Sequence, residues 1–287
     1  MGERQRFQPI DSLLYAYLVV VAVIAFSRLS TRPYASSVLL VAGLIALLPV
    51  LLRRDDLGRF GRGLQEVYPI LILPVLYGML DLLNGANIPV WDSLVQGWEQ
   101  RIFGGQVSLT WWQSMPSQFW STLLHAAYFG FYLIVPFPVF YFLARGKRAE
   151  ARVAVQAIVA TFVVCYVIFL LFPVAGPYYQ FPRPTGSFVD NWAARLVYAT
   201  LSQGSSYGAA FPSSHVAATI AATIATWHGS RRVGLLLLAP TALLTVGVVY
   251  CQMHYAIDAL TGLILPLLLV PPVILFARRA ARETAIA

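Results

Sequence analysis

Ionisable side chains open two long apolar segments of the chain, in the stretches Phe211-Pro212-Ser213-Ser214-His215 and His254-Tyr255-Ala256-Ile257-Asp258. Each segment is long enough to cross a lipid bilayer. A charged Asp at the centre of a membrane helix costs on the order of 2.5 kcal/mol or more on insertion scales. Ionisable groups that persist beside such helices usually line a polar cavity and act there. We therefore expect the two stretches to form one site in a bundle of membrane helices.

Composition indicates the class of protein. Hydrophobic residues make up 59% of the 287 residues and charged residues only 11%, whereas about 25% of a soluble domain is charged. We therefore predict an all-α, polytopic membrane helix bundle. The net charge is +8, but the basic residues lie in short clusters between apolar segments, which membrane topology explains without a nucleic-acid partner. Cys165 and Cys251 lie in apolar runs and are predicted to be packing residues.

Eight apolar segments have the length that a bilayer core requires, about 17–28 residues. They cover residues 11–27, 35–52, 67–83, 117–144, 152–173, 213–229, 233–252 and 255–277. We expect residues 1–66 to hold two N-terminal transmembrane helices and residues 67–287 to form a six-helix core. Within that core, residues 84–116 are rich in Trp and predict an interfacial segment. Residues 174–212 are rich in Pro, Gly, Ser and Tyr and predict a long outer loop.

The 20 Lys and Arg residues predict the orientation of the chain. With eight spans, the side that holds both termini carries Arg4, Arg6, Arg53, Arg54, Arg59, Arg62, Arg145, Lys147, Arg148, Arg152, Arg231, Arg232, Arg278, Arg279 and Arg282. The other side carries only Arg28, Arg32, Arg101, Arg183 and Arg195. The positive-inside rule therefore predicts that both termini are cytoplasmic. In this topology both histidine stretches lie at the non-cytoplasmic face, together with the long outer loop.

The residue types in the two stretches suit phosphoryl chemistry. His254 and Asp258 share one face of a helix, where the carboxylate can accept a hydrogen bond from one imidazole nitrogen and leave the other nucleophilic. His215 lies in the first turn of its helix, where free N–H groups and the helix dipole bind anions. Ser213 or Ser214 can cap that helix or contact an oxyanion. Two imidazoles at one anion site can attack phosphorus and protonate the leaving alkoxide, respectively.

Each motif also has a structural interpretation. A single His at a helix start is more often a cap than a catalyst, and a lone His-x-x-x-Asp is a weak signal. Both motifs at one membrane face, in a chain with only four histidines, favour function. His125, Tyr128 and Asp81 are expected beside the site as supporting residues, with packing or capping as the alternative. His228 is expected on the cytoplasmic side, where it would be inert.

The pattern FPSSH, an apolar helix pair and then HYAID at the start of the last helix resembles the type 2 phosphatidic acid phosphatase superfamily. The chain looks closest to the branch of inositol phosphorylceramide synthases and sphingomyelin synthases, and the run Leu171-Phe172-Pro173-Val174-Ala175-Gly176-Pro177 looks like that branch too. The resemblance covers about residues 67–277. It implies that His254 is the nucleophile of a phosphohistidine, Asp258 its orienting carboxylate and His215 the acid–base group. It implies no metal and no other cofactor.

Two departures from the family pattern bear on the substrate. Phosphatase members usually carry Lys, six intervening residues and Arg-Pro; Arg183-Pro184 matches the second half, but the Lys position is Gly176. They also carry Ser-Arg where this chain has Gly247-Val248. Arg183 is therefore either a phosphate ligand or a chance match in a loop. A phosphate monoester approaches two negative charges and needs several cations, whereas a diester carries one charge. The missing Lys and Arg favour a phosphodiester, with Arg195 or Arg101 as alternative sources of the lost charge.

We therefore expect a lipid phosphotransferase that moves a phosphorylated head group from a membrane phospholipid to a lipid alcohol. The alternative within the family is a lipid phosphate phosphatase that acts on phosphatidate or a polyprenyl phosphate with water as acceptor. A transporter or lipid-binding protein without turnover is an alternative from another class. A metal site built from the His and Asp side chains is a further one.

Overall fold

The computed structural model describes residues 8–52, 57–85 and 88–286. Within these residues the regular structure is helical, apart from one isolated parallel bridge between Val174 and Ala209. The helices are α1 Pro9–Ser27, α2 Ala35–Leu52, α3 Arg59–Leu71, α4 Leu73–Asn84, α5 Asp92–Phe103, α6 Val107–Ser114, α7 Gln118–Phe129, α8 Phe131–Ile134, α9 Phe137–Ala144, α10 Arg148–Leu171, α11 Pro177–Gln180, η1 Gly186–Phe188, α12 Trp192–Gly204, α13 Ser214–Gly229, α14 Arg231–Tyr250 and α15 Ala256–Ile286. Arg4, Arg6, Arg53 and Arg54 of the predicted topology lie outside the described residues.

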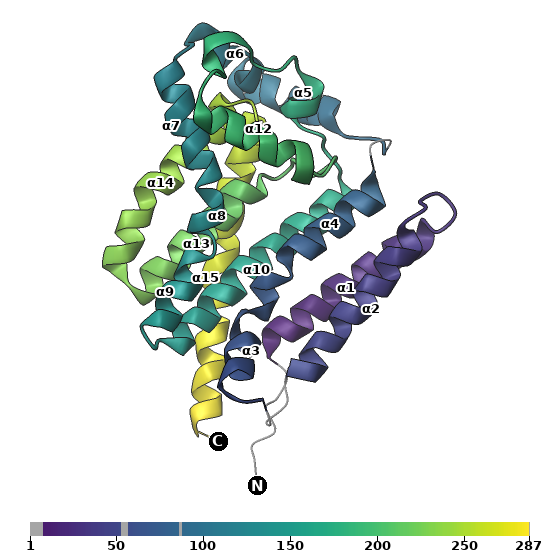
Figure 1. Ribbon diagram of the computed structural model, residues 1–287, viewed down its shortest axis with the longest axis vertical. Helices are drawn as coiled ribbons and strands as arrows, with labels where there is room; N and C mark the ends of the chain where they lie inside the picture. The colour runs from purple at the N-terminus through teal and green to yellow at the C-terminus, as the bar shows by residue number, and fades with distance from the viewer. Residues whose placement is uncertain (1–7, 53–56, 86–87, 287) are drawn as a thin grey trace.

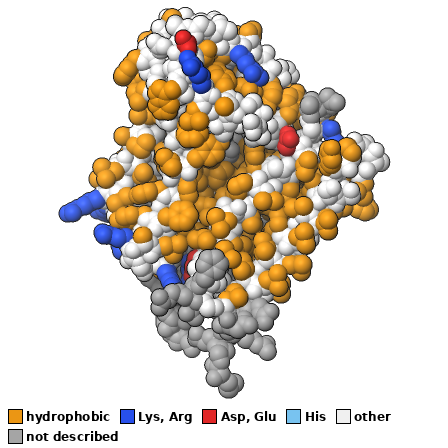
Figure 2. Space-filling model, in the orientation of Figure 1, with side chains coloured by type: hydrophobic (Ala, Val, Ile, Leu, Met, Phe, Trp, Pro, Cys, Tyr) orange, Lys and Arg blue, Asp and Glu red, His pale blue; other side chains and the backbone are white. Residues whose placement is uncertain are grey.

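Six helical stretches are long and apolar enough to cross a membrane, and a bent pair raises the number to as many as seven in the described part of the chain. The six are Pro9–Ser27, Ala35–Leu52, Gly63–Asn84, Arg148–Leu171, Arg231–Tyr250 and Ala256–Arg279. Large apolar side chains such as Leu133, Leu236 and Leu268 are exposed, as expected where lipid surrounds the helices. Figure 2 shows hydrophobic side chains over most of one face, with charged side chains toward the two ends. The chain is a multi-pass membrane protein with an all-α fold.

Two of the eight predicted spans look different in the structure. The predicted span 117–144 is broken into α7, α8 and α9, and its two halves are bent by 47°. Pro136 and Pro138 stand at the break, because proline lacks the N–H that would continue a helix. The predicted span 213–229 is α13, which has 16 residues. A helix of that size is about 24 Å long, shorter than a hydrocarbon core of about 30 Å.

The short helix α13 packs against α10, α14 and α15. Its buried residues include Ala217 and Ala221, and small side chains of this kind let neighbouring helices approach closely. At Gly262 of α15, an added Cβ would lie only 2.6 Å from the carbonyl oxygen of Ser213. The close approach brings the start of α13 beside the start of α15, two positions far apart in the sequence.

Three helices outside the membrane-spanning set, α5, α6 and α12, lie together over one end of the bundle, and the C-terminal part of α15 lies at the opposite end (Figure 1). The helices α5 and α6 lie within residues 84–116, the segment for which an interfacial position is predicted. The predicted outer loop 174–212 contains the 13-residue helix α12, which the loop-like composition did not indicate. The side chain of Asn191 caps α12 by accepting a 2.9 Å hydrogen bond from the N–H of Ala194. The helix buries Ala193 and Val197.

Replacing Gly262 by Ala should destabilise the protein, because the new methyl group would press against the backbone of Ser213. Overpacking of this kind costs about 1–3 kcal/mol, and we expect the melting temperature of the detergent-solubilised protein to fall by several degrees. The matched control is Gly78→Ala in α4, where an added Cβ meets nothing within 4 Å. That control should melt at the wild-type temperature or slightly above it. Equal melting temperatures for the two variants would contradict the close approach.

Candidate active site

The two histidine stretches meet where α13 and α15 begin. The ring centroids of His215 and His254 are 5.6 Å apart, and the ring planes make an angle of 58°. Their backbones are also joined, because the N–H of Ser213 donates a 3.0 Å hydrogen bond to the carbonyl oxygen of Asp258. Two stretches whose histidines are 39 positions apart in the sequence therefore form one polar cluster within an apolar bundle.

The ring of His254 is held by its Nδ1 atom. This nitrogen lies 3.1 Å from the carbonyl oxygen of Ala210 and 3.5 Å from Oδ2 of Asp258. Because a carbonyl oxygen can only accept a hydrogen bond, the contact requires the proton on Nδ1 and leaves the lone pair on Nε2. Burial lowers the pKa of His254 to about 4, so the ring is neutral at pH 7. A neutral imidazole with a fixed tautomer is the form that can act as a nucleophile.

Asp258 has two roles in the geometry. Its Oδ2 atom accepts a 2.9 Å hydrogen bond from the N–H of Tyr255, the residue just before α15, which is one half of a helix capping box. The same oxygen faces Nδ1 of His254 at 3.5 Å, where it would stabilise positive charge on the ring. One oxygen of Asp258 therefore caps the start of α15 and faces the ring of His254. The closer partner of Nδ1 is the carbonyl of Ala210, which the sequence did not indicate.

His215 lies between two aromatic rings of the broken span. The ring of Tyr128 stacks on it at 4.8 Å and that of Phe131 lies at 4.4 Å between centroids. The Nε2 atom of His215 is 3.2 Å from the hydroxyl oxygen of Tyr128. Both rings come from the Gln118–Ile134 half of the broken span, which lies before the bend, and Tyr128 contacts the predicted site directly. The Nδ1 atom of His215 is buried without a hydrogen-bond partner among the described residues.

The two predicted serines occupy the start of α13. Ser213 is fully buried and is the N-cap of the helix, with its Oγ 3.4 Å from the N–H of Val216. This is the capping role that the sequence left open. Ser214 is the first residue of α13 and is 5% exposed. Both serines are therefore beside His215, and the phosphate contact predicted for them is compatible with their position in the chain.

The other predicted residues have different surroundings. The guanidinium of Arg183 is 4.2 Å from the ring centre of Tyr178, and Arg183 is exposed. His125 is buried in a separate cluster, with Nδ1 2.8 Å from the carbonyl oxygen of Ser121 and 3.3 Å from the sulfur of Cys251. Asp81 is exposed on α4. Packing is the interpretation that the surroundings of His125 favour.

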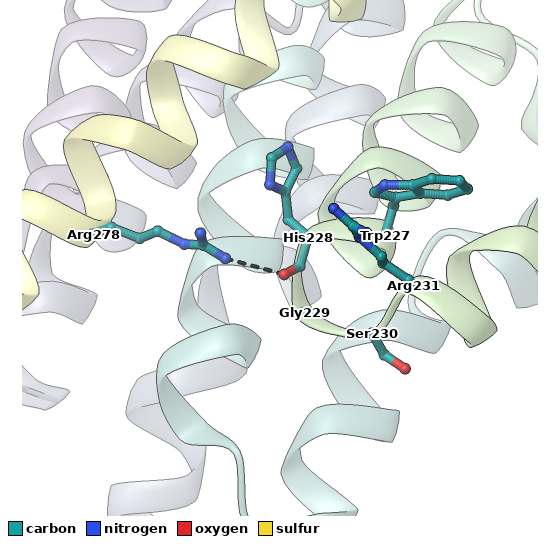
Figure 3. Close-up of a pocket in the computed structure, with 6 residues that line it drawn as sticks. All are labelled: Trp227, His228, Gly229, Ser230, Arg231 and Arg278. Carbon is teal, nitrogen blue, oxygen red and sulfur yellow. Dashed lines mark hydrogen bonds between the residues drawn. The ribbon is translucent and has the colours of Figure 1, made fainter.

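His228 lies at the far end of α13 from His215. The two histidines are 13 positions apart, which corresponds to about 20 Å of helix. His228 lines a pocket of about 440 Å³ together with Trp227, Gly229, Ser230, Arg231 and Arg278 (Figure 3). Arg278 points from α15 toward His228 and donates a 3.1 Å hydrogen bond to its carbonyl oxygen (Figure 3). This pocket is therefore separate from the histidine pair.

Two buried acidic residues of α5 also reach the site, and the sequence analysis missed both. Glu99 accepts hydrogen bonds from the N–H groups of Val107 at 2.8 Å and Ala256 at 3.1 Å, so it caps the starts of α6 and α15 together. Asp92 binds the backbone of the loop before α11. Two features of the sequence could have indicated them. The chain has only 12 Asp and Glu residues, and Asp92 and Glu99 lie seven positions apart, on one face of a helix.

The family comparison agrees with this arrangement. A family model described as the PAP2 superfamily matches residues 99–271, which is more than half of the chain and includes both histidine stretches. The chain belongs to the PAP2 superfamily. It is thus a phosphatase or phosphotransferase of a superfamily that acts on lipid phosphates. No curated protein and no solved structure matches the chain. Within the described residues, no three His, Cys, Asp or Glu side chains gather as a metal site would require.

The buried carboxyl of Glu99 should make stability depend on pH. Burial raises the pKa of Glu99 to about 7 from its ordinary value of 4.5. Between these two pH values the folded protein keeps a proton that the unfolded chain has lost, so stability falls as the pH rises through that window. The variant Glu99→Gln cannot ionise, and its melting temperature should fall less than that of the wild type between about pH 5 and pH 7.5.

The matched control for this measurement is Glu150→Gln in the first turn of α10. It should follow the wild-type melting curve over the same pH range. Parallel curves for the wild type and Glu99→Gln would show that Glu99 does not titrate in this window.

Proposed function

We propose that this protein is an integral membrane lipid phosphotransferase, which moves a phosphorylated head group from a phospholipid to a lipid alcohol through a phosphohistidine. The observation that carries the proposal is the pair of imidazole rings 5.6 Å apart, one of them neutral with its proton held on Nδ1. At this spacing both rings can reach substituents of one phosphorus atom. Membership of the PAP2 superfamily supports phosphoryl chemistry at this pair.

The proposed reaction has two steps. In the first, Nε2 of His254 attacks the phosphorus of the donor lipid, the bond from phosphorus to the diacylglycerol oxygen breaks, and His215 gives a proton to that oxygen. In the second, His215 takes the proton of the acceptor hydroxyl, whose oxygen attacks phosphorus and releases His254. Asp258 stabilises the positive charge on the phosphorylated ring, and Ser213 and Ser214 are proposed to contact the phosphate. The new lipid keeps the donor's head group and its phosphate.

The charges around the histidines favour a phosphodiester donor. Three acidic side chains, those of Asp92, Glu99 and Asp258, lie in the buried polar network. Any negative charge that they carry raises the cost of each added negative charge on the substrate. The cation predicted for phosphate, Arg183, contacts the ring of Tyr178. A site with several acidic groups and few cations suits a phosphodiester, which carries one negative charge, better than a phosphate monoester, which approaches two.

The positions of two glycines support the same choice. The resemblance to the superfamily places a Lys at Gly176 and a Ser at Gly247 in phosphatase members. Gly176 has a φ of +89°, and an added Cβ would lie 2.8 Å from the Cβ of Ala210. An added Cβ at Gly247 would lie 2.8 Å from the carbonyl oxygen of Leu124. Neither position has room for the longer side chain, which is in line with the inositol phosphorylceramide synthase and sphingomyelin synthase branch.

The proposed topology puts the site at the non-cytoplasmic face, with both termini in the cytoplasm. It rests on the positive-inside rule, and the interfacial helices α5, α6 and α12 over one end of the bundle are in keeping with it (Figure 1). The family match begins at residue 99, so α1 and α2 lie before it. We propose that residues 67–287 form the catalytic core and that residues 1–66 are an added pair of helices.

Replacing His254 by Ala should abolish product formation, and His215→Ala should lower turnover by about 10²- to 10⁴-fold, the usual contribution of a general acid–base group. The matched control is His228→Ala, which removes the histidine at the other end of α13 and should keep wild-type activity. Turnover would be measured on purified protein in lipid nanodiscs by mass spectrometry. Unchanged turnover in His254→Ala would refute the phosphohistidine mechanism.

The acceptor can be identified with phospholipids labelled in the head-group phosphate. Incubated with the protein and a panel of lipid alcohols, they should give label in a second lipid and free diacylglycerol. Release of inorganic phosphate from phosphatidate or a polyprenyl phosphate, without a labelled second lipid, would instead identify a phosphatase with water as acceptor. The His254→Ala variant serves as the blank for both readouts.

A further inference from the structure

Asp92 is a buried carboxylate, 3% exposed, that accepts hydrogen bonds from three groups. Its Oδ2 accepts from the N–H of Ala175 at 2.7 Å, and its Oδ1 accepts from the N–H of Gly176 at 2.8 Å and from the hydroxyl of Tyr255 at 2.9 Å. The three donors come from two segments about 80 residues apart in the sequence. One carboxylate thus ties the loop before α11 to the residue that follows His254.

The loop that Asp92 holds leads to the ring of His254. Val174, next to Ala175, forms the parallel bridge: its N–H donates to the carbonyl of Gly208 at 3.1 Å, and its carbonyl accepts from the N–H of Ala210 at 2.9 Å. The carbonyl oxygen of Ala210 is the acceptor of the His254 Nδ1 proton. A continuous path of backbone hydrogen bonds therefore runs from Asp92 to the atom that fixes the His254 tautomer.

We propose that Asp92 is a positioning residue for the reaction, which keeps the ring of His254 in the Nδ1-protonated form with Nε2 directed at the substrate. The effect on kcat that we expect from this role rests on the proposed function. Asp92 acts from two sides: through the loop and Ala210 on the ring itself, and through the hydroxyl of Tyr255 on the adjoining backbone. It does not touch the reacting atoms.

The geometry explains why a carboxylate is needed here. Two converging N–H groups and one O–H group must be accepted at a buried position, and a carboxylate offers acceptors on both oxygens whereas an amide offers one. In Asp92→Asn, one donor would face the amide N–H₂ and lose its partner, which costs about 1–3 kcal/mol for a buried group. The loop would relax, and the carbonyl of Ala210 would move relative to His254.

The test compares Asp92→Asn with Asp190→Asn in the full-length protein. Asp190 forms an ion pair with Arg195 in which both side chains are largely exposed, 69% and 71%, so its variant is a matched control that should behave as wild type. For Asp92→Asn we expect kcat to fall about 10- to 100-fold with KM changed less than about twofold, the pattern of a misoriented group. Wild-type kcat in this variant would overturn the proposal.

A second readout follows the ring itself and needs no substrate. In protein labelled with ¹⁵N-histidine, four histidines contribute signals, and the His254→Ala spectrum assigns the missing one. We expect a single Nδ1–H tautomer for His254 in the wild type and in Asp190→Asn, and a mixture of tautomers in Asp92→Asn. If Asp92 only held the loop in place, the ¹⁵N signal of His254 would be the same in Asp92→Asn as in the wild type. That result would also overturn the proposal.

Two further variants separate the possible failures. If Asp92→Asn does not give a single size-exclusion peak, Tyr255→Phe decides. This variant removes the hydroxyl that donates to Asp92 and also accepts from Nε2 of Gln96 at 2.8 Å, and it leaves the two backbone hydrogen bonds on the carboxylate. A smaller loss of kcat, about 3- to 10-fold, supports the proposal and wild-type kcat refutes it. Turnover that survives in His254→Ala would defeat the proposed function instead. In that case the tautomer measurement still judges the role of Asp92.

Discussion

The site depends on a backbone contact between the starts of two helices. The N–H of Ser213 donates to the carbonyl oxygen of Asp258, and Gly262 allows this approach because it has no Cβ. In an apolar bundle, backbone groups without partners cost several kcal/mol each, so the contact fixes how α13 and α15 are placed along each other. The 5.6 Å spacing of the two imidazoles follows from that placement.

The polar network around the histidines is built from carboxylates and backbone donors rather than from ion pairs. Asp258, Glu99 and Asp92 each accept hydrogen bonds from N–H groups at helix starts or in the loop. Elsewhere the chain satisfies a buried carboxylate with a cation, as Arg152 does for Glu66. This difference supports the phosphodiester donor that we propose, because a site without a paired cation has little positive charge for a dianionic phosphate.

The broken fourth span supplies the aromatic side chains around His215. A straight helix over residues 117–144 is the simplest interpretation of its hydropathy, yet the span bends by 47° after Ile134. The rings of Tyr128 and Phe131, both before the bend, pack against the imidazole. His125, one turn away from Tyr128 on the same helix, joins a different cluster with Cys251, which local spacing alone could not reveal.

The sequence by itself determined the membrane class, the helical fold and the two histidine stretches, because apolar length, charge placement and i, i+4 spacing are local properties. Tertiary structure alone decided what holds each group: Ala210, 44 positions from His254 in the sequence, supplies the acceptor for its ring, and Asp92, 83 positions from Ala175, supports that loop. The partner of Nδ1 is a backbone carbonyl, which every residue possesses, so no residue type could mark it. Only the packing of distant segments selects which carbonyl and which carboxylate arrive at the site.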